Sequence, residues 1–212
     1  MTNPGYIYKF IPSPREDAHT ILLLHGTGGN EDDLLILAGE FGSSFSYLSL
    51  RGNVPENGMP RFFARLAMGI FDEDDLRLRT GQMCSFVASL GSKESFNPDK
   101  IIAVGYSNGA NIAGAALMQQ PGFLKGAVLF RPMQPFKRDI PEFSAEKKFP
   151  VLMTSGSMDP TVTVSEAQNY ARLLETNGYD VTHEIVNTGH NLTSDDVMLA
   201  KKFLSTYFKT QS

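Results

Sequence analysis

The sequence has a single cysteine, no long apolar run and no excess of basic residues, and each of these features excludes a class of structure or partner. Cys84 alone cannot form an internal disulfide, and its surroundings indicate a buried position inside a helix. No apolar stretch is long enough to cross a bilayer, so we expect no membrane span. The formal net charge is −4 with no long basic block, which argues against nucleic acid as a partner.

Targeting and metal-binding patterns are also missing. Residues 1–10 lack the basic and apolar segments of a secretory signal, so we expect a cytoplasmic protein. No paired His or Cys spacing suits zinc, and residues 25–30 do not match a phosphate-binding loop, so we expect no metal site. The chain has 212 residues, 42% of them hydrophobic, with no repeat or low-complexity linker. We therefore expect residues 1–212 to form one domain.

Short apolar runs alternate with segments of helical spacing, which predicts an α/β fold: a mostly parallel central sheet with helices on both faces. The strand-like runs are 6–11, 20–25, 45–50, 100–105, 126–130, 150–155 and 181–186. The helical segments are 31–41, 73–90, 108–120, 163–177 and 193–208. No connection is long enough for a large lid domain.

The most informative motif is Gly105-Tyr106-Ser107-Asn108-Gly109, which follows an apolar run and precedes a helical segment. A strand that ends in Gly-x-Ser-x-Gly must turn sharply into a helix, and this turn leaves the serine hydroxyl exposed. The motif predicts a nucleophile elbow with Ser107 as the nucleophile.

The partners of such a serine follow in the order this fold requires, first an acid and then a histidine. Asp159 lies just beyond a predicted strand, and His190 lies between a predicted strand and the last helix. A histidine base and an acid that orients it would activate the serine hydroxyl. Each residue alone could be an ordinary turn or capping residue. Their joint order and context favour a triad of Ser107, Asp159 and His190.

A glycine-rich loop, His25-Gly26-Thr27-Gly28-Gly29, follows the predicted strand 20–25. Acyl transfer needs preorganised donors for the developing oxyanion. The backbone N–H groups of Thr27 and Asn108 are the two that a loop and an elbow would supply. We interpret His25 as a residue that holds this loop by hydrogen bonding.

Two connections, Arg51 to Phe71 and Arg131 to Phe149, are longer than packing requires and follow strands on the active face. Ligands of open α/β sheets bind beyond the carboxyl ends of the strands. These connections therefore supply the candidates for a substrate pocket, which are Phe62, Phe63, Met68, Met133, Arg51 and Arg131. For each of the two arginines, an ordinary ion pair is favoured over a contact with a ligand.

With these motifs assembled, the chain resembles the α/β-hydrolase superfamily, and within it the small phospholipase/carboxylesterase family that includes acyl-protein thioesterases. The resemblance covers essentially the whole chain. It implies the triad and oxyanion donors named above and hydrolysis of carboxylic esters or thioesters without a cofactor. The elbow reads Gly-Tyr-Ser-Asn-Gly where acyl-protein thioesterases commonly have Gly-Phe-Ser-Gln-Gly. The segment 51–63 looks more like bacterial carboxylesterases found with hydroquinone- and catechol-responsive detoxification systems.

The sequence thus predicts a serine carboxylesterase that acts on a small-molecule ester, small or aromatic, through an acyl-enzyme. Two alternatives stay open: an acyl thioesterase or lysophospholipase, and a ligand-binding receptor of this fold with vestigial turnover. The natural substrate, the acyl-chain length and the formation of a homodimer also stay open.

Overall fold

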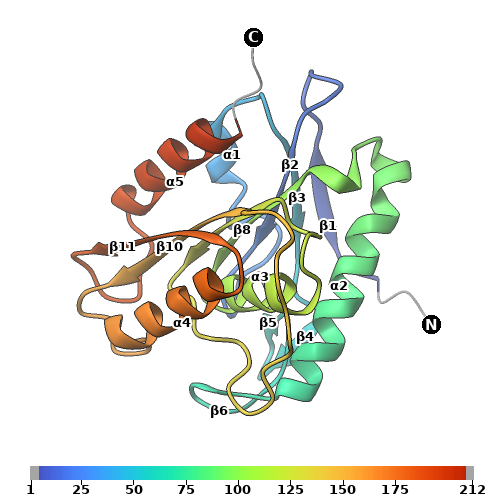
Figure 1. Cartoon of the computed structure of the whole chain (residues 1–212). Coiled ribbons are helices and arrows are strands. Elements are labelled where there is room, and N and C mark those ends of the chain that lie inside the picture. Colours follow the sequence, from blue (N-terminus) through green and yellow to red (C-terminus); the bar gives the residue numbers. More distant parts are fainter. Residues whose placement is uncertain (1–4, 209–212) are drawn as a thin grey trace.

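A seven-stranded sheet forms the centre of the computed structural model, which describes residues 5–208 (Figure 1). β1 runs antiparallel to β3, and the other neighbouring pairs are parallel. In spatial order the strands are β1 (Tyr8–Ile11), β3 (Ser46–Leu50), β2 (Thr20–Leu24), β8 (Ile101–Tyr106), β9 (Gly126–Phe130), β10 (Pro150–Gly156) and β11 (Asp180–Val186). The predicted α/β fold is confirmed.

Helices cover both faces of this sheet (Figure 1). α1 (Ile36–Phe41) and α5 (Ser194–Tyr207) pack on one face, and α2 (Glu73–Glu94), α3 (Asn108–Gln119) and α4 (Val164–Thr176) pack on the other. A short 3-10 turn, η1 (Pro98–Lys100), precedes β8. Strands covered on both faces read as continuous apolar runs, and all five residues of β2 are buried.

The first helix is shorter than the sequence predicts. Helical spacing extends over 31–41, but the α-helix begins at Ile36 and the preceding residues form turns. Glu31 is buried in these turns and forms an ion pair with Arg51. The Asn30 side-chain oxygen accepts from the amide of Asp32, and a local bond of this kind competes with helix hydrogen bonds at the start of the segment.

Two small antiparallel hairpins occupy the connection between β3 and α2, where the apolar runs of the sequence predict no strands. They are β4 (Val54–Glu56) with β5 (Met59–Arg61), and β6 (Arg65–Ala67) with β7 (Ile70–Phe71). The first turns at Asn57-Gly58, and both of these residues have positive φ. Asn-Gly is the preferred pair for a two-residue hairpin turn. The signal for this hairpin was therefore present in the sequence.

No helix within residues 5–208 has the length and apolar character needed to cross a bilayer. Cys84 is buried inside α2, as predicted, and its exposed fraction is 1%. Burial raises the pKa of its thiol to about 12.

Candidate active site

The three residues of the predicted triad follow three parallel strands at the same edge of the sheet. Ser107 follows β8, Asp159 lies just after β10, and His190 lies in the loop after β11. Parallel strands place their carboxyl ends side by side, which is where ligands of open α/β sheets bind. The topology therefore brings together residues that are up to 83 positions apart in sequence.

Ser107 lies at a sharp turn between β8 and α3, with φ 50° and ψ −110°. Its amide donates to the carbonyl of Phe130, and its own carbonyl accepts from the amide of Asn111. The two motif glycines permit this path. A Cβ atom on Gly105 would lie 2.6 Å from the Gly109 carbonyl, and one on Gly109 would collide with the carbonyl oxygen of Leu24.

A continuous chain of hydrogen bonds joins the three side chains. His190 Nε2 lies 2.9 Å from Ser107 Oγ, and His190 Nδ1 lies 2.7 Å from Asp159 Oδ2. The Asp159 carboxylate is only 1% exposed, whereas the His190 ring is 25% exposed. The other carboxylate oxygen, Oδ1, accepts from the amides of Thr161 and Val162, so the carboxylate is fixed before it meets the ring.

The loop that carries Thr27 is held from three sides. The His25 ring donates from Nδ1 to the Gly26 carbonyl and accepts at Nε2 from the amide of Gly52. Burial lowers the pKa of His25, which favours this neutral form. The Arg61 guanidinium donates to Thr27 Oγ1 at 2.6 Å, and the Gly28 amide donates to the Pro60 carbonyl. The loop 25–29 is therefore tied to β5.

Asn108, the second candidate oxyanion donor, is buried at the start of α3. Its side-chain oxygen accepts from the amide of Phe62 at 2.8 Å, which ties the elbow to the segment after β5. The first amides of a helix have no acceptor within that helix. The Asn108 N–H group is thus available to a ligand oxygen.

The four apolar candidates for the substrate pocket lie in three different environments. Phe62 and Phe63 have 0% exposure and belong to the core between the sheet and α2 and α3, because the hairpins fold this segment inward. Met68 lies on the tip of the second hairpin and is 73% exposed. Met133 is 8% exposed and lines a cavity.

Both arginine candidates form ion pairs. Arg51 makes a two-pronged contact with Glu31, which holds the pKa of that carboxyl below its usual range. Arg131 is fully buried against Asp196, with both side chains at 0% exposure. Burial would raise the pKa of Asp196, but hydrogen bonds from Arg131, Thr154 and Thr193 outweigh burial and lower it. The Arg131 side chain is turned inward and forms the ion pair expected in preference to a ligand contact, so it is not exposed to a ligand.

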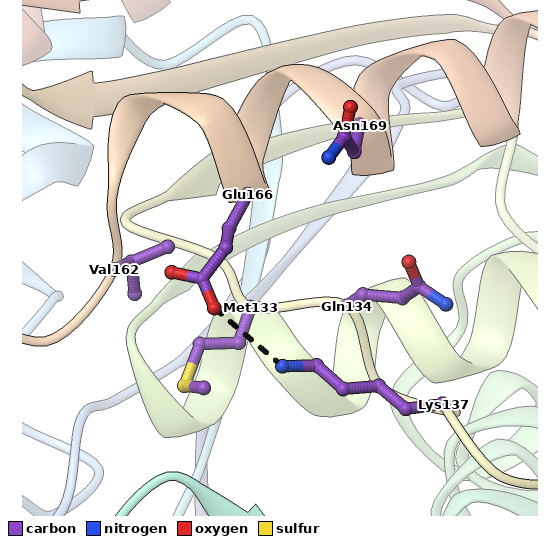
Figure 2. A pocket seen from close by; sticks show the side chains of 6 residues that line it. All are labelled: Met133, Gln134, Lys137, Val162, Glu166 and Asn169. Carbon is purple, nitrogen blue, oxygen red and sulfur yellow. Dashed lines mark ion pairs between the residues drawn. The ribbon is translucent and has the colours of Figure 1, made fainter.

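A cavity of about 190 Å³ lies between α4 and the segment after β9 (Figure 2). Figure 2 shows Lys137 and Glu166 reaching toward each other from these two elements, and their charged atoms are 3.8 Å apart. Val162 belongs both to this cavity and to the loop that fixes Asp159. The cavity therefore adjoins the acid end of the hydrogen-bonded chain. Its lining residues are Met133, Gln134, Lys137, Val162, Glu166 and Asn169.

Three contributors to this site were not identified from the sequence: Arg61, Tyr106 and Asp196. The Tyr106 hydroxyl donates to the carbonyl of His190 at 3.1 Å. Its place inside the Gly-x-Ser-x-Gly motif was visible, but its partner is 84 residues away. Within residues 5–208, no group of three or more His, Cys, Asp or Glu side chains could hold a metal ion.

Comparison with known proteins identifies the family to which the chain belongs. Residues 8–208 match the model of the phospholipase/carboxylesterase family. MhqD of Bacillus subtilis (strain 168) is 41% identical over 186 residues, covering 87% of this chain and 92% of MhqD. The structure of the Bacillus cereus carboxylesterase is 42% identical with a TM-score of 0.93, covering 98% of this chain and 97% of that one. A carboxylesterase from Mesorhizobium loti is 25% identical with a TM-score of 0.87, covering 97% of each chain. The chain belongs to the phospholipase/carboxylesterase family, whose α/β-hydrolase fold it shares.

Proposed function

We propose that this hydrolase is a serine carboxylesterase in which Ser107 is the nucleophile, His190 the general base and Asp159 the residue that orients the base. The observation that carries the proposal is the hydrogen-bonded chain from Asp159 through His190 to Ser107, with separations of 2.7 and 2.9 Å. A hydroxyl, an imidazole and a carboxylate in this order can activate the hydroxyl at neutral pH.

In the acylation step, Ser107 Oγ attacks the carbonyl carbon of the ester while His190 Nε2 accepts the hydroxyl proton. The tetrahedral intermediate collapses, the bond from carbon to the alcohol oxygen breaks, and the imidazolium gives its proton to that oxygen. In deacylation, water attacks the acyl-enzyme and His190 accepts its proton. The acid then leaves as that proton returns to Ser107 Oγ, so the enzyme is regenerated without a cofactor.

The negative charge that develops on the carbonyl oxygen needs donors already in place. We assign this role to the backbone N–H groups of Thr27 and Asn108. Support comes from the contacts that fix both segments: Arg61 on the Thr27 side chain and the Phe62 amide on the Asn108 side chain. Because these donors belong to the main chain, we expect the chain path to matter more than either side chain.

The size of the neighbouring cavity favours a small substrate. Its volume of about 190 Å³ slightly exceeds that of an engineered apolar cavity of about 150 Å³ that binds benzene. A short acyl chain or one aromatic ring fits such a space, whereas a sixteen-carbon chain would extend out of its open side. We therefore propose small or aromatic esters as the substrate class.

One observation favours a second candidate, an acyl thioesterase or lysophospholipase. The hairpins β4–β5 and β6–β7 carry exposed apolar side chains, at 41% for Met59, 63% for Leu66, 73% for Met68 and 57% for Ile70. An apolar surface of this kind can cover a longer acyl chain that extends beyond the cavity.

Two measurements test the proposal. Stoichiometric labelling of Ser107 by a fluorophosphonate, together with turnover of p-nitrophenyl acetate, is expected for an esterase and would separate it from a ligand-binding receptor. A panel of acyl lengths from two to sixteen carbons then separates the two enzyme classes. A rise in kcat/KM up to sixteen carbons would replace the small-ester proposal with the second candidate.

A further inference from the structure

Every hydrogen-bond donor of the Arg131 side chain has a partner inside the protein. A guanidinium carries five N–H donors. Nη1 donates to Thr154 Oγ1 and Asp196 Oδ1, Nη2 donates to Asp196 Oδ2 and the Asn191 carbonyl, and Nε donates to the Gly189 carbonyl. These contacts use every donor within the buried interior, and none is left for a substrate.

Two of these contacts bracket His190. The carbonyls of Gly189 and Asn191 accept from Arg131 at 3.3 and 3.0 Å, and the carbonyl of His190 itself accepts from Tyr106 at 3.1 Å. Three consecutive carbonyls are therefore held by side chains from the ends of β8 and β9. The backbone that carries the proposed base is fixed independently of the base's own bond to Asp159.

Asp196 connects this arrangement to α5. It stands in the first turn of α5, where its carboxylate accepts from the amide and hydroxyl of Thr193 and also from the Thr154 hydroxyl. One carboxylate thus caps the helix, pairs with Arg131 and binds β10. The loop 187–193 is held at its middle by Arg131 and at its end by Asp196.

Stability alone is a weak reason for this pair. Two buried charges lose their hydration, and apolar residues of similar volume often serve the fold equally well or better. The pair does supply what apolar side chains cannot, namely directed bonds to the two carbonyls beside His190.

We propose that Arg131 and Asp196 form a positioning pair that holds the 189–191 backbone so that His190 Nε2 stays within hydrogen-bond reach of Ser107. The inference rests on the proposed serine esterase function. Neither residue touches substrate or the reacting atoms. Displacing a catalytic group by about 1 Å can lower a rate about 10²-fold, so the pair is expected to act on kcat.

The variant Arg131→Lys tests this directly. Lysine keeps a positive charge beside Asp196, but its single ammonium cannot reproduce the planar fork that reaches the carboxylate and both carbonyls. We expect a folded protein in which kcat for p-nitrophenyl acetate falls at least about tenfold while KM stays within about threefold. The rate of fluorophosphonate labelling at Ser107 should fall in parallel. Wild-type kcat and labelling rate in a folded Arg131→Lys protein would overturn the proposal.

A matched control is Arg79→Lys, which alters an arginine that pairs with Asp75 on α2, away from the loop 187–193. Its kcat and KM should equal those of the wild type. If Arg79→Lys lowered kcat as much as Arg131→Lys, the effect would not be specific to the His190 loop and the proposal would fail.

Should Arg131→Lys fold poorly, the triple variant Arg131→Met, Thr154→Val, Asp196→Leu separates structure from positioning. The triple variant removes both buried charges and the Thr154 hydroxyl, which bonds to both of them. Its melting temperature should therefore exceed that of Arg131→Met, which leaves the Asp196 charge buried without its partner. Measured below that temperature, kcat should stay low. Recovery of kcat together with stability would mean that the pair serves only the fold.

The wild-type protein distinguishes failure of this inference from failure of the proposed function. If the wild type is not labelled at Ser107 and does not turn over the ester, the proposed function is wrong. If the wild type reacts and the variants equal it, the function stands and the positioning role falls.

Discussion

The candidate site has two sides, which differ in the burial and polarity of their side chains. On the His190 side, polar groups are buried and paired, with Arg131 and Asp196 at 0% exposure. On the hairpin side, the apolar side chains of Leu66 and Met68 are mostly exposed. A fully satisfied buried polar network fixes one geometry, whereas exposed loop residues tolerate change. We therefore propose that separate segments position His190 and contact the substrate, so that the two properties can be varied separately.

The largest effect is expected at Ser107, the proposed nucleophile. Ser107→Ala should lower kcat on a short ester by at least about 10⁴-fold, because the covalent route disappears while the oxyanion donors remain. Steady-state kinetics with a thermal melt of the same sample checks this. A folded variant with near-normal turnover would remove Ser107 from the proposed mechanism.

On the His190 side, Asp159→Asn should lower kcat by about 10³- to 10⁴-fold. The amide would face Nδ1 with a donor, which favours the tautomer whose Nε2 cannot accept the serine proton. Stability should change little, because the side-chain oxygen that accepts from Thr161 and Val162 is kept. Full activity in this variant, with loss of activity on substitution of another acid, would show that Asp159 is the wrong orienter.

On the hairpin side, the double variant Leu66→Ala, Met68→Ala should leave kcat for acetyl esters and the melting temperature nearly unchanged. Only substrates long enough to contact these two side chains should show a lower kcat/KM. For each substrate methylene that no longer packs against Leu66 or Met68, kcat/KM should fall up to about fourfold, since burying one methylene contributes about 0.8 kcal/mol. Rates with acetyl, hexanoyl and palmitoyl esters check this. An equal decrease on all three would contradict the separation of the two sides. Phe63→Ala is unsuitable for this purpose, because that ring lies in the core.

The smallest expected effect is that of acidic pH on the free energy of unfolding. Burial lowers the pKa of His19, His25 and His183 in the folded protein. Below their ordinary value of about 6.5 the unfolded chain therefore binds more protons, and the free energy of unfolding should fall as pH drops. The lowered pKa of Asp196 acts at lower pH: its contribution is present above about 3.8 and is lost as pH falls through the folded value.

Urea unfolding at pH 7.5 and 5.5 measures the histidine contribution. His183→Gln should reduce the difference between the two pH values, since His183 is one of the three groups and bonds to Ser155 on the neighbouring strand. Equal stability at both pH values in the wild type would contradict the prediction.

The sequence was sufficient for the seven strands of the central sheet and for the long helices, because buried strands and amphipathic helices leave local patterns. It also grouped Ser107, Asp159 and His190, since each follows a strand at the same edge of the sheet. It could not assign Arg131, whose partner Asp196 is 65 residues away and is brought near only by the fold. The burial of Phe62 depends on the hairpin that precedes it. The Asn57-Gly58 turn is a local signal for this hairpin, but the direction in which the hairpin folds is set by contacts with distant residues such as Asn108.

The backbone at Ser107 has a consequence for how this protein could change. With φ at 50° and ψ at −110°, it occupies a region that is unfavourable for any residue with a Cβ atom, at a cost on the order of 1–3 kcal/mol. Glycine would relieve that cost, so Ser107→Gly should melt at a higher temperature than both the wild type and Ser107→Ala. The inactive glycine form would then be the more durable protein. A directed-evolution experiment that rewards heat resistance alone, without an activity screen, would favour variants that have lost their chemistry.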